Sequence, residues 1–140
     1  MDRKGFFSID ALFAVTLLLM ISGVLLNLYE GRGQAAAWSS TANEAKMACE
    51  KLAAAINTVY ASGPDSELYL DLPTTIDNYV YTLSYDSSHR QIIAEMPELG
   101  ITERTSKAAV ACKNIQLENL NFSRQIWVRW LGGNIEVMNA

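Results

Sequence analysis

The stretch that decides the fold is Arg3-Lys4-Gly5-Phe6-Phe7-Ser8-Ile9-Asp10, which leads directly into an apolar run at residues 11–26. Residues 6–26 make about 21 residues of helix, and at 1.5 Å per residue this length matches the ~30 Å hydrocarbon core of a bilayer. We therefore predict a transmembrane helix over residues 6–26. Arg3 and Lys4 precede it, so the positive-inside rule keeps the N-terminus in the cytoplasm and exports the remainder of the chain.

Asp10 places a carboxylate in the first turn or so of this predicted span. An ionised carboxylate inside a membrane helix costs a few kcal/mol on insertion scales, so such a residue usually has a partner or a special role. The alternative is that Asp10 lies shallow enough to reach interfacial water. The sequence leaves both explanations open.

Gly5 stands just before the apolar run, where a small and flexible residue suits a protease that draws the chain into an extended conformation. A cut after Gly5 would make Phe6 the new N-terminus and Asp10 the fifth residue of the mature chain. In these features the sequence resembles the prepilins of type IV pili. Their signature is a short basic leader ending in Gly, a cut on the cytoplasmic side, and an acidic residue at the fifth mature position.

The finer match divides between two branches of that family. Ser8 and Asp10 resemble the archaeal class III leader, in which Gln usually follows the cut and Ser and Glu occupy the third and fifth mature positions. Here Phe6 replaces the Gln, and an N-terminal Phe is commoner in bacterial type IV pilins. The body of the chain, including residues 53–63 and 70–73, looks more like the small archaeal pilins. The archaeal or bacterial source stays open.

The resemblance implies a structural filament subunit, neither an enzyme nor a cofactor-binding protein. A prepilin peptidase would cut between Gly5 and Phe6, and an assembly ATPase with its membrane platform would move the subunit from the cell membrane into an extracellular filament of pilin subunits. Phe6, Ser8 and Asp10 would lie at the assembly end of the helix. In the filament Asp10 would pair with the amine of a neighbouring Phe6 and so fix the axial register. The resemblance does not distinguish a major pilin from a minor pilin or a pseudopilin, and it does not identify the adhesion target.

Two other interpretations of the same segment remain. A secretory signal peptide would be cleaved at the small residues Gln34-Ala35-Ala36-Ala37. Against this, the apolar run exceeds the usual signal-peptide length of about 7–15 residues, and residues 27–34 form an unusually long, charged segment between the run and the cleavage site. Cleavage there would release a secreted extracellular binding module, and an uncleaved anchor would leave a membrane-anchored one; neither would polymerise. Asp10 would then be incidental.

Past the span, apolar residues recur at alternating spacings of four and three, which is the stripe of an amphipathic helix. Its members are Trp38, Ala42, Ala45, Cys49, Leu52, Ile56 and Val59. We predict one helix from near Phe6 to near Tyr60, apolar over residues 6–26 and amphipathic over 27–61. Gly31 and Gly33 interrupt it and produce either a kink or a plain helix that tolerates two glycines, at ~1 kcal/mol each.

Residues 62–140 read as a β-rich head domain. Ser62-Gly63-Pro64-Asp65 ends the helix, and alternating residues predict strands at 67–72, 79–85, 91–96, 108–112, 124–131 and 134–138. Residues 86–90 form one hairpin turn, and Gly132-Gly133 form another by supplying positive φ. The predicted fold class is therefore α+β, with a long N-terminal helix packed on a small antiparallel sheet.

Residues able to carry chemistry are sparse. His89 is the only histidine and falls in a predicted turn, which excludes a histidine-rich metal site or a catalytic dyad, and no phosphate-binding glycine loop is present. The net charge is −4, with basic residues interleaved with acids, so nucleic acid is not an expected partner. The strand aromatics are expected to pack within the domain.

Cys49 on the helix stripe and Cys112 on a strand both face inward, and in an exported domain this favours a disulfide that closes a loop of about 60 residues and stabilises by ~4 kcal/mol. Two buried free thiols are the alternative. Asn121-Phe122-Ser123 is a candidate glycosylation sequon.

Overall fold

The computed structural model describes residues 9–97 and 106–140, with the side chains at 34, 35, 37 and 38 left out. The predicted leader and processing residues Arg3, Lys4, Gly5, Phe6 and Ser8 lie outside the described residues, and so does the side chain of Trp38 on the predicted stripe. The chain divides into two compact units, Met1–Ser39 and Ser40–Ala140. The second unit is called the head below.

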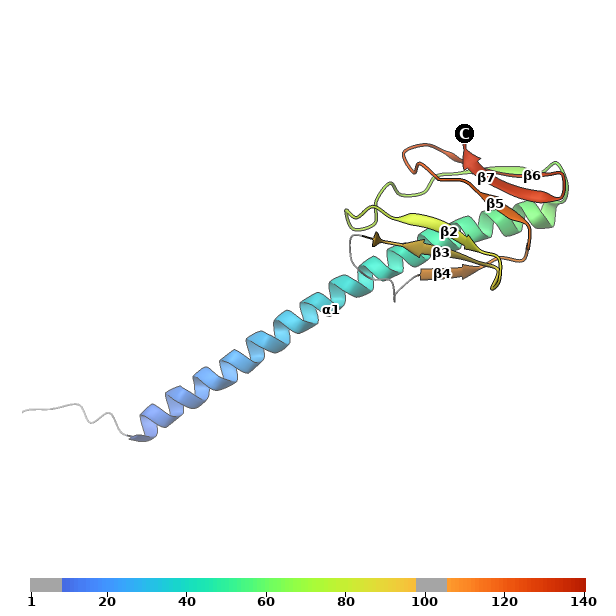
Figure 1. The fold of residues 1–140 in the computed structure, drawn as a ribbon. Coiled ribbons are helices and arrows are strands. Elements are labelled where there is room, and N and C mark those ends of the chain that lie inside the picture. Colours follow the sequence, from blue (N-terminus) through green and yellow to red (C-terminus); the bar gives the residue numbers. More distant parts are fainter. Residues whose placement is uncertain (1–8, 98–105) are drawn as a thin grey trace, which may run out of the picture. The chain divides into compact units, whose positions relative to one another are not determined.

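Helix α1 (Ile9–Ser62) is 54 residues long and confirms the predicted long N-terminal helix (Figure 1). Its helical backbone continues through Gly31 and Gly33, because glycine keeps its backbone N–H and costs only ~1 kcal/mol relative to alanine. The helix ends at Ser62, and the next residue, Gly63, has a φ of 94° in the left-handed region that favours glycine. The Ser66 hydroxyl stabilises this helix end, because its Oγ lies 2.8 Å from the Val59 carbonyl oxygen and 2.6 Å from that of Gly63.

Within residues 67–97 and 106–140 seven strands are described, and they form two sheets. One sheet has the order β1-β6-β7-β5 and comprises β1 (Glu67–Leu70), β6 (Ile126–Leu131), β7 (Asn134–Asn139) and β5 (Ile115–Leu117). The other has the order β2-β3-β4 and comprises β2 (Thr82–Asp86), β3 (Gln91–Glu95) and β4 (Ser106–Ala109). Both predicted hairpins are present, β2–β3 and β6–β7. Gly132 (φ 60°) and Gly133 (φ 92°) form the turn of the second, as a two-residue hairpin loop requires.

The sheets differ from the prediction in the bounds of several strands, in one additional strand and in their number. β5 was not predicted, and it pairs with β7 in parallel, with Ile115 opposite Ile135. β4 begins at Ser106, two residues before the predicted strand at 108–112. The strands form two sheets rather than one. The Tyr85 hydroxyl of β2 donates to the Cys112 carbonyl oxygen (3.2 Å) and to that of Lys113 (3.0 Å), in the segment that leads into β5.

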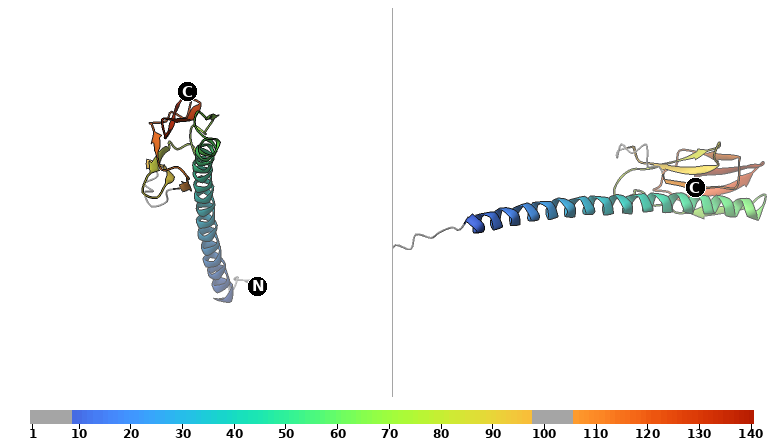
Figure 2. Two further views of the ribbon diagram at one scale, coloured as in Figure 1. Left: turned by 90° about the vertical axis from the view of Figure 1, so that its right-hand side faces the viewer. Right: turned by 90° about the horizontal axis from the view of Figure 1, so that it is seen from below.

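The core of the head lies between the sheets and one face of α1, and both views in Figure 2 place the strands on one side of this part of the helix. The helix contributes Cys49, Leu52, Ile56 and Val59, each at most 1% exposed. The strands contribute Ile92, Ile126, Val128, Ile135 and Val137, which are fully buried. Tyr81 is buried as well, where its hydroxyl donates to the Pro73 carbonyl (2.6 Å) and its ring stacks on Phe122 at 4.3 Å. Burial raises the pKa of the Tyr81 hydroxyl.

Every buried side chain among the described residues lies between Thr41 and Val137, inside the head. We therefore expect a fragment of residues Ser40–Ala140 to fold on its own. In that fragment Leu52→Ala should lower the free energy of unfolding by about 2–5 kcal/mol, because it removes a fully buried side chain and leaves a cavity. Met47→Ala, on the same helix but 66% exposed, should change it by less than about 0.5 kcal/mol. Urea titrations followed by tryptophan fluorescence measure both, and equal effects would contradict this core.

Candidate functional site

The segment Ile9–Gly33 of α1 is the strongest functional feature, because its apolar surface is left open. Its most apolar window has a mean hydropathy of 2.4, and none of that window is buried within the described chain. At 1.5 Å per residue its 25 residues extend ~37 Å, which exceeds the ~30 Å of a hydrocarbon core. By length and composition this helix is able to cross a membrane, either as an anchor or as a signal sequence.

The polar residues inside this segment are adapted to an apolar environment. No Asp, Glu, Lys or Arg occurs between Asp10 and Glu30. Thr16 Oγ1 donates to the Leu12 carbonyl and Ser22 Oγ to the Leu18 carbonyl, each at 2.8 Å and one turn back along the helix. Both hydroxyl protons are therefore satisfied without water, as a lipid or protein interior requires.

Asp10 is the acidic residue in the first turn of α1. At this position the partial positive charge of the helix N-terminus favours a carboxylate. The other residues predicted for the assembly end, Phe6 and Ser8, fall outside the described residues. The predicted function of this end therefore depends on its sequence and on the position of Asp10 in the helix.

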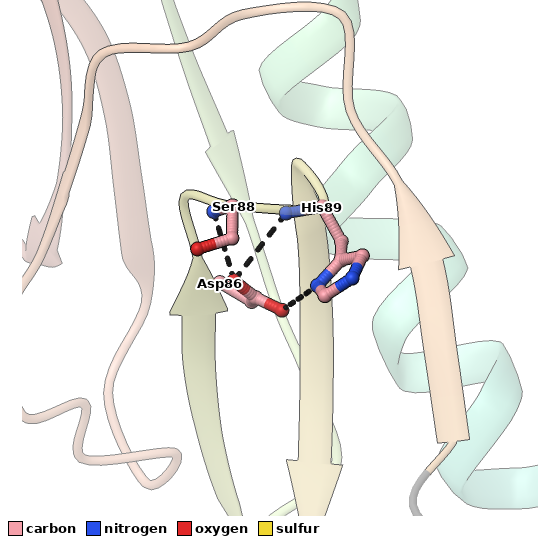
Figure 3. A network of polar contacts seen from close by, with 3 residues as sticks. All are labelled: Asp86, Ser88 and His89. Atoms are coloured by element: carbon pink, nitrogen blue, oxygen red, sulfur yellow. Dashed lines mark hydrogen bonds and ion pairs between the residues drawn. The ribbon is translucent and has the colours of Figure 1, made fainter.

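Asp86, Ser88 and His89 form a polar cluster of the head, in the β2–β3 turn (Figure 3). Asp86 Oδ1 accepts the backbone N–H groups of Ser88 (2.9 Å) and His89 (3.4 Å), and its Oδ2 lies 2.6 Å from His89 Nδ1. The hydrogen bond from the His89 ring lowers the pKa of Asp86. The His89 side chain is 73% exposed. The three residues close a turn, at the place where the sequence predicted one.

The outer face of the larger sheet carries Trp127, whose ring contacts Tyr69 and Arg129. The Tyr69 ring lies parallel to it at 5.8 Å, and the Arg129 guanidinium lies 4.6 Å from the ring centroid. The Trp127 Nε1–H donates to Glu67, and Arg129 pairs with Glu136 at 2.7 Å. Trp130 belongs to the opposite face and stacks on Tyr60 at 5.2 Å. These contacts are cross-strand and helix–sheet packing, as the sequence predicted.

Within residues 9–97 and 106–140 no group of three His, Cys, Asp or Glu side chains is placed to hold a metal ion. Asn121, the predicted sequon residue, lies exposed in the turn that precedes β6. The predicted site residues thus fall in separate places: Asp10 on the apolar helix segment, and the cysteines and Asn121 in the head.

The predicted disulfide between Cys49 and Cys112 is wrong, because both residues are buried free thiols. Cys49 Sγ lies 3.4 Å from the Ser106 carbonyl, whereas Cys112 Sγ lies 3.5 Å from that of Asn114. The Asn57 side chain accepts the Ala111 N–H at 2.8 Å, which places the residue before Cys112 about two helical turns, or ~12 Å, beyond Cys49 along α1. A disulfide needs Cα atoms within ~7 Å. Both side chains do face the core, but they lie at different positions along the axis of α1.

Comparisons of this chain with protein-family profiles, with curated proteins and with solved structures find no match.

The cysteines lead to a test in solution. Burial raises the pKa of the Cys49 thiol to about 11, so little reactive thiolate forms at neutral pH. We expect a maleimide reagent at pH 7 to label neither cysteine of the native chain within minutes, and to label both after denaturation without reductant. If the denatured, unreduced chain incorporates no label until reductant is added, the two cysteines are bonded and the free-thiol assignment is wrong. Intact mass spectrometry counts the labels, and a pre-reduced sample is the control.

Proposed function

We propose that this chain is a structural, non-enzymatic subunit of a type IV pilus-like extracellular filament, assembled through its N-terminal helix. The observation that carries the proposal is the Ile9–Gly33 segment: a helix apolar on all sides, unburied, and with a single carboxylate in its first turn. The basic leader ending in Gly5, with Asp10 five residues beyond it, adds the prepilin resemblance.

A helix that is apolar on every face is stable only where other apolar groups surround it. A lipid bilayer supplies that environment to a single subunit, and a bundle of identical helices supplies it to an assembled one. The segment suits both environments, because the Thr16 and Ser22 hydroxyls donate to carbonyls of the same helix and need no outside partner. Gly23 has open space where a Cβ would lie, so another helix is able to approach closely there. The subunit would thus pass from membrane to filament without exposing this surface to water.

Processing would prepare the chain for that transfer. In this proposal a prepilin peptidase cuts after Gly5, and the new amine of Phe6 carries a positive charge in the apolar end of the helix. In the filament the Asp10 carboxylate of a neighbouring subunit compensates that charge. An assembly ATPase and its membrane platform supply the work of extraction. A buried ion pair of this kind specifies alignment more than it adds stability, so its role is to set the axial register of the subunits.

The signal-peptide alternative places its cut at residues 34–37, in the interior of α1. A protease would have to unwind the helix there, and the cut would discard the whole apolar segment. The monomeric anchor alternative keeps the segment but gives Asp10 no role. The two following experiments separate these possibilities from the filament.

We expect the mature chain to begin at Phe6. N-terminal peptide mapping by mass spectrometry, on protein taken from the membranes and from the cell exterior of its own source, identifies the first residue. A mature chain that begins near Trp38 would instead establish the signal-peptide alternative and rule out assembly through this helix. A chain that retains Met1 or Asp2 would indicate an uncleaved anchor.

Substituting Asp10 distinguishes a filament subunit from a monomeric anchor. Asp10→Asn leaves the neighbour's buried ammonium uncompensated, and breaking such a pair costs about 3–5 kcal/mol per site, so we expect filaments to be lost while membrane levels stay normal. Asp10→Glu keeps the charge and should preserve filaments. Sheared extracellular filaments and membrane fractions are compared in cells that lack the wild-type copy.

Glu30→Gln is the matched control, since it removes a carboxylate from the same helix at the other end of the apolar segment. It should leave both membrane levels and filaments intact. Normal filaments from Asp10→Asn would refute the pairing. An equal loss of filaments from Glu30→Gln would mean that removing any carboxylate from the helix is harmful, which also contradicts a specific role for Asp10.

A further inference from the structure

The turn before β6 carries an Asn-X-Ser triplet that the filament function does not use. Asn121-Phe122-Ser123 is the only Asn-X-Ser/Thr triplet in the 140 residues. Asn121 and Ser123 are both exposed, whereas Phe122 between them is half-buried and stacks on Tyr81 at 4.3 Å. The apolar residue thus anchors the triplet to the core, and its two polar residues remain at the surface.

The backbone of Asn121 is held in place by a second asparagine. The Asn121 N–H donates to Asn139 Oδ1, and Asn139 Nδ2 donates to the Asn121 carbonyl, each at 2.8 Å. The Arg124 N–H also donates to that carbonyl at 3.1 Å, which closes a four-residue turn. Asn121 Oδ1 accepts the Ser123 N–H at 3.0 Å, and Asn121 Nδ2 has no hydrogen-bond partner among the described residues.

We infer that Asn121 is an acceptor for an N-linked glycan on the exported head. The inference rests on the proposed export of residues 40–140, since the donor of such a glycan is a lipid-linked sugar on the outer side of the membrane. Asn121 Nδ2 forms a bond to the anomeric carbon of that sugar. The bond from the anomeric carbon to the lipid phosphate oxygen breaks, the lipid phosphate leaves, and a base of the membrane transferase takes the amide proton.

The folded head accommodates the glycan without rearrangement. Each hydrogen bond that holds the Asn121 backbone comes from Asn139 or from the Arg124 N–H, and the Nδ2 atom takes part in none of them. The attached sugar therefore extends from an exposed turn into solvent, and the Phe122–Tyr81 stack underneath stays in place.

The chain offers a matched pair of variants for the test. Ser123→Ala removes the hydroxyl that defines the acceptor triplet but keeps the Ser123 backbone N–H that Asn121 Oδ1 accepts. Ser123→Thr keeps the triplet. Intact mass and peptide mapping are measured on subunits from membranes and from sheared filaments of the source cell. We expect wild-type and Ser123→Thr subunits to carry a sugar mass on the peptide that contains Asn121, Ser123→Ala to lose it entirely, and Asn119→Gln, next to the triplet, to retain it.

Protease treatment of intact cells separates failure of this inference from failure of the filament proposal. A head that is digested from outside yet has the unmodified polypeptide mass overturns the glycan and leaves the filament standing. A glycosylated subunit found only in membranes supports the glycan and contradicts the filament. A head that is protected from protease and unmodified overturns both.

Discussion

An apolar helix surface that the chain itself does not cover is the constraint on which this protein depends. Burying a large apolar side chain is worth about 1.5–3 kcal/mol, so the run of exposed Leu, Ile, Val, Phe and Met side chains in Ile9–Gly33 outweighs the roughly 5–15 kcal/mol that holds a typical domain together. The surroundings of this segment therefore dominate the behaviour of the molecule. Water is the one environment that it must avoid throughout.

The head meets the opposite requirement, since it buries its own apolar surface. Between residues 45 and 59, α1 turns a single face toward the sheets, and small residues alternate on it with Leu52, Ile56 and Val59. Three tyrosines connect the layers. Tyr60 stacks on β6, the Tyr81 hydroxyl reaches the loop after β1, and Tyr85 of β2 reaches the segment that leads into β5. Tyr81 is buried, Tyr85 is partly buried and hydrogen-bonded through its hydroxyl, and Tyr60 stacks on the sheet while staying partly exposed.

Sequence patterns predicted those features that neighbouring residues determine, namely the helix and the hairpins. Hydrophobic periodicity gave helix ends within a few residues of Ile9 and Ser62, and Gly132-Gly133 predicted the β6–β7 hairpin. β5 was missed because Ile115-Gln116-Leu117 is too short a stretch for its alternation to mark a strand, and because its parallel partner is distant in sequence. The disulfide prediction was wrong for a related reason. Periodicity indicates which face of α1 Cys49 occupies, but it does not indicate which residue of α1 lies beside Cys112. At the candidate site, the apolar span was foreseen, whereas the role of Asp10 depends on a leader outside the described residues.

The side-chain contacts between α1 and the strands have a mechanical consequence. Ser106 donates to the Ala42 carbonyl, Lys51 to that of Asp71, and the Ala111 N–H to Asn57, so polar links are spread over some 15 residues of helix, or ~22 Å. A pull along the helix axis would strain these links and the apolar contacts between them in parallel, as shear, whereas peeling would break them one after another. Resistance to traction would then be a property of how the head is fastened to its own helix.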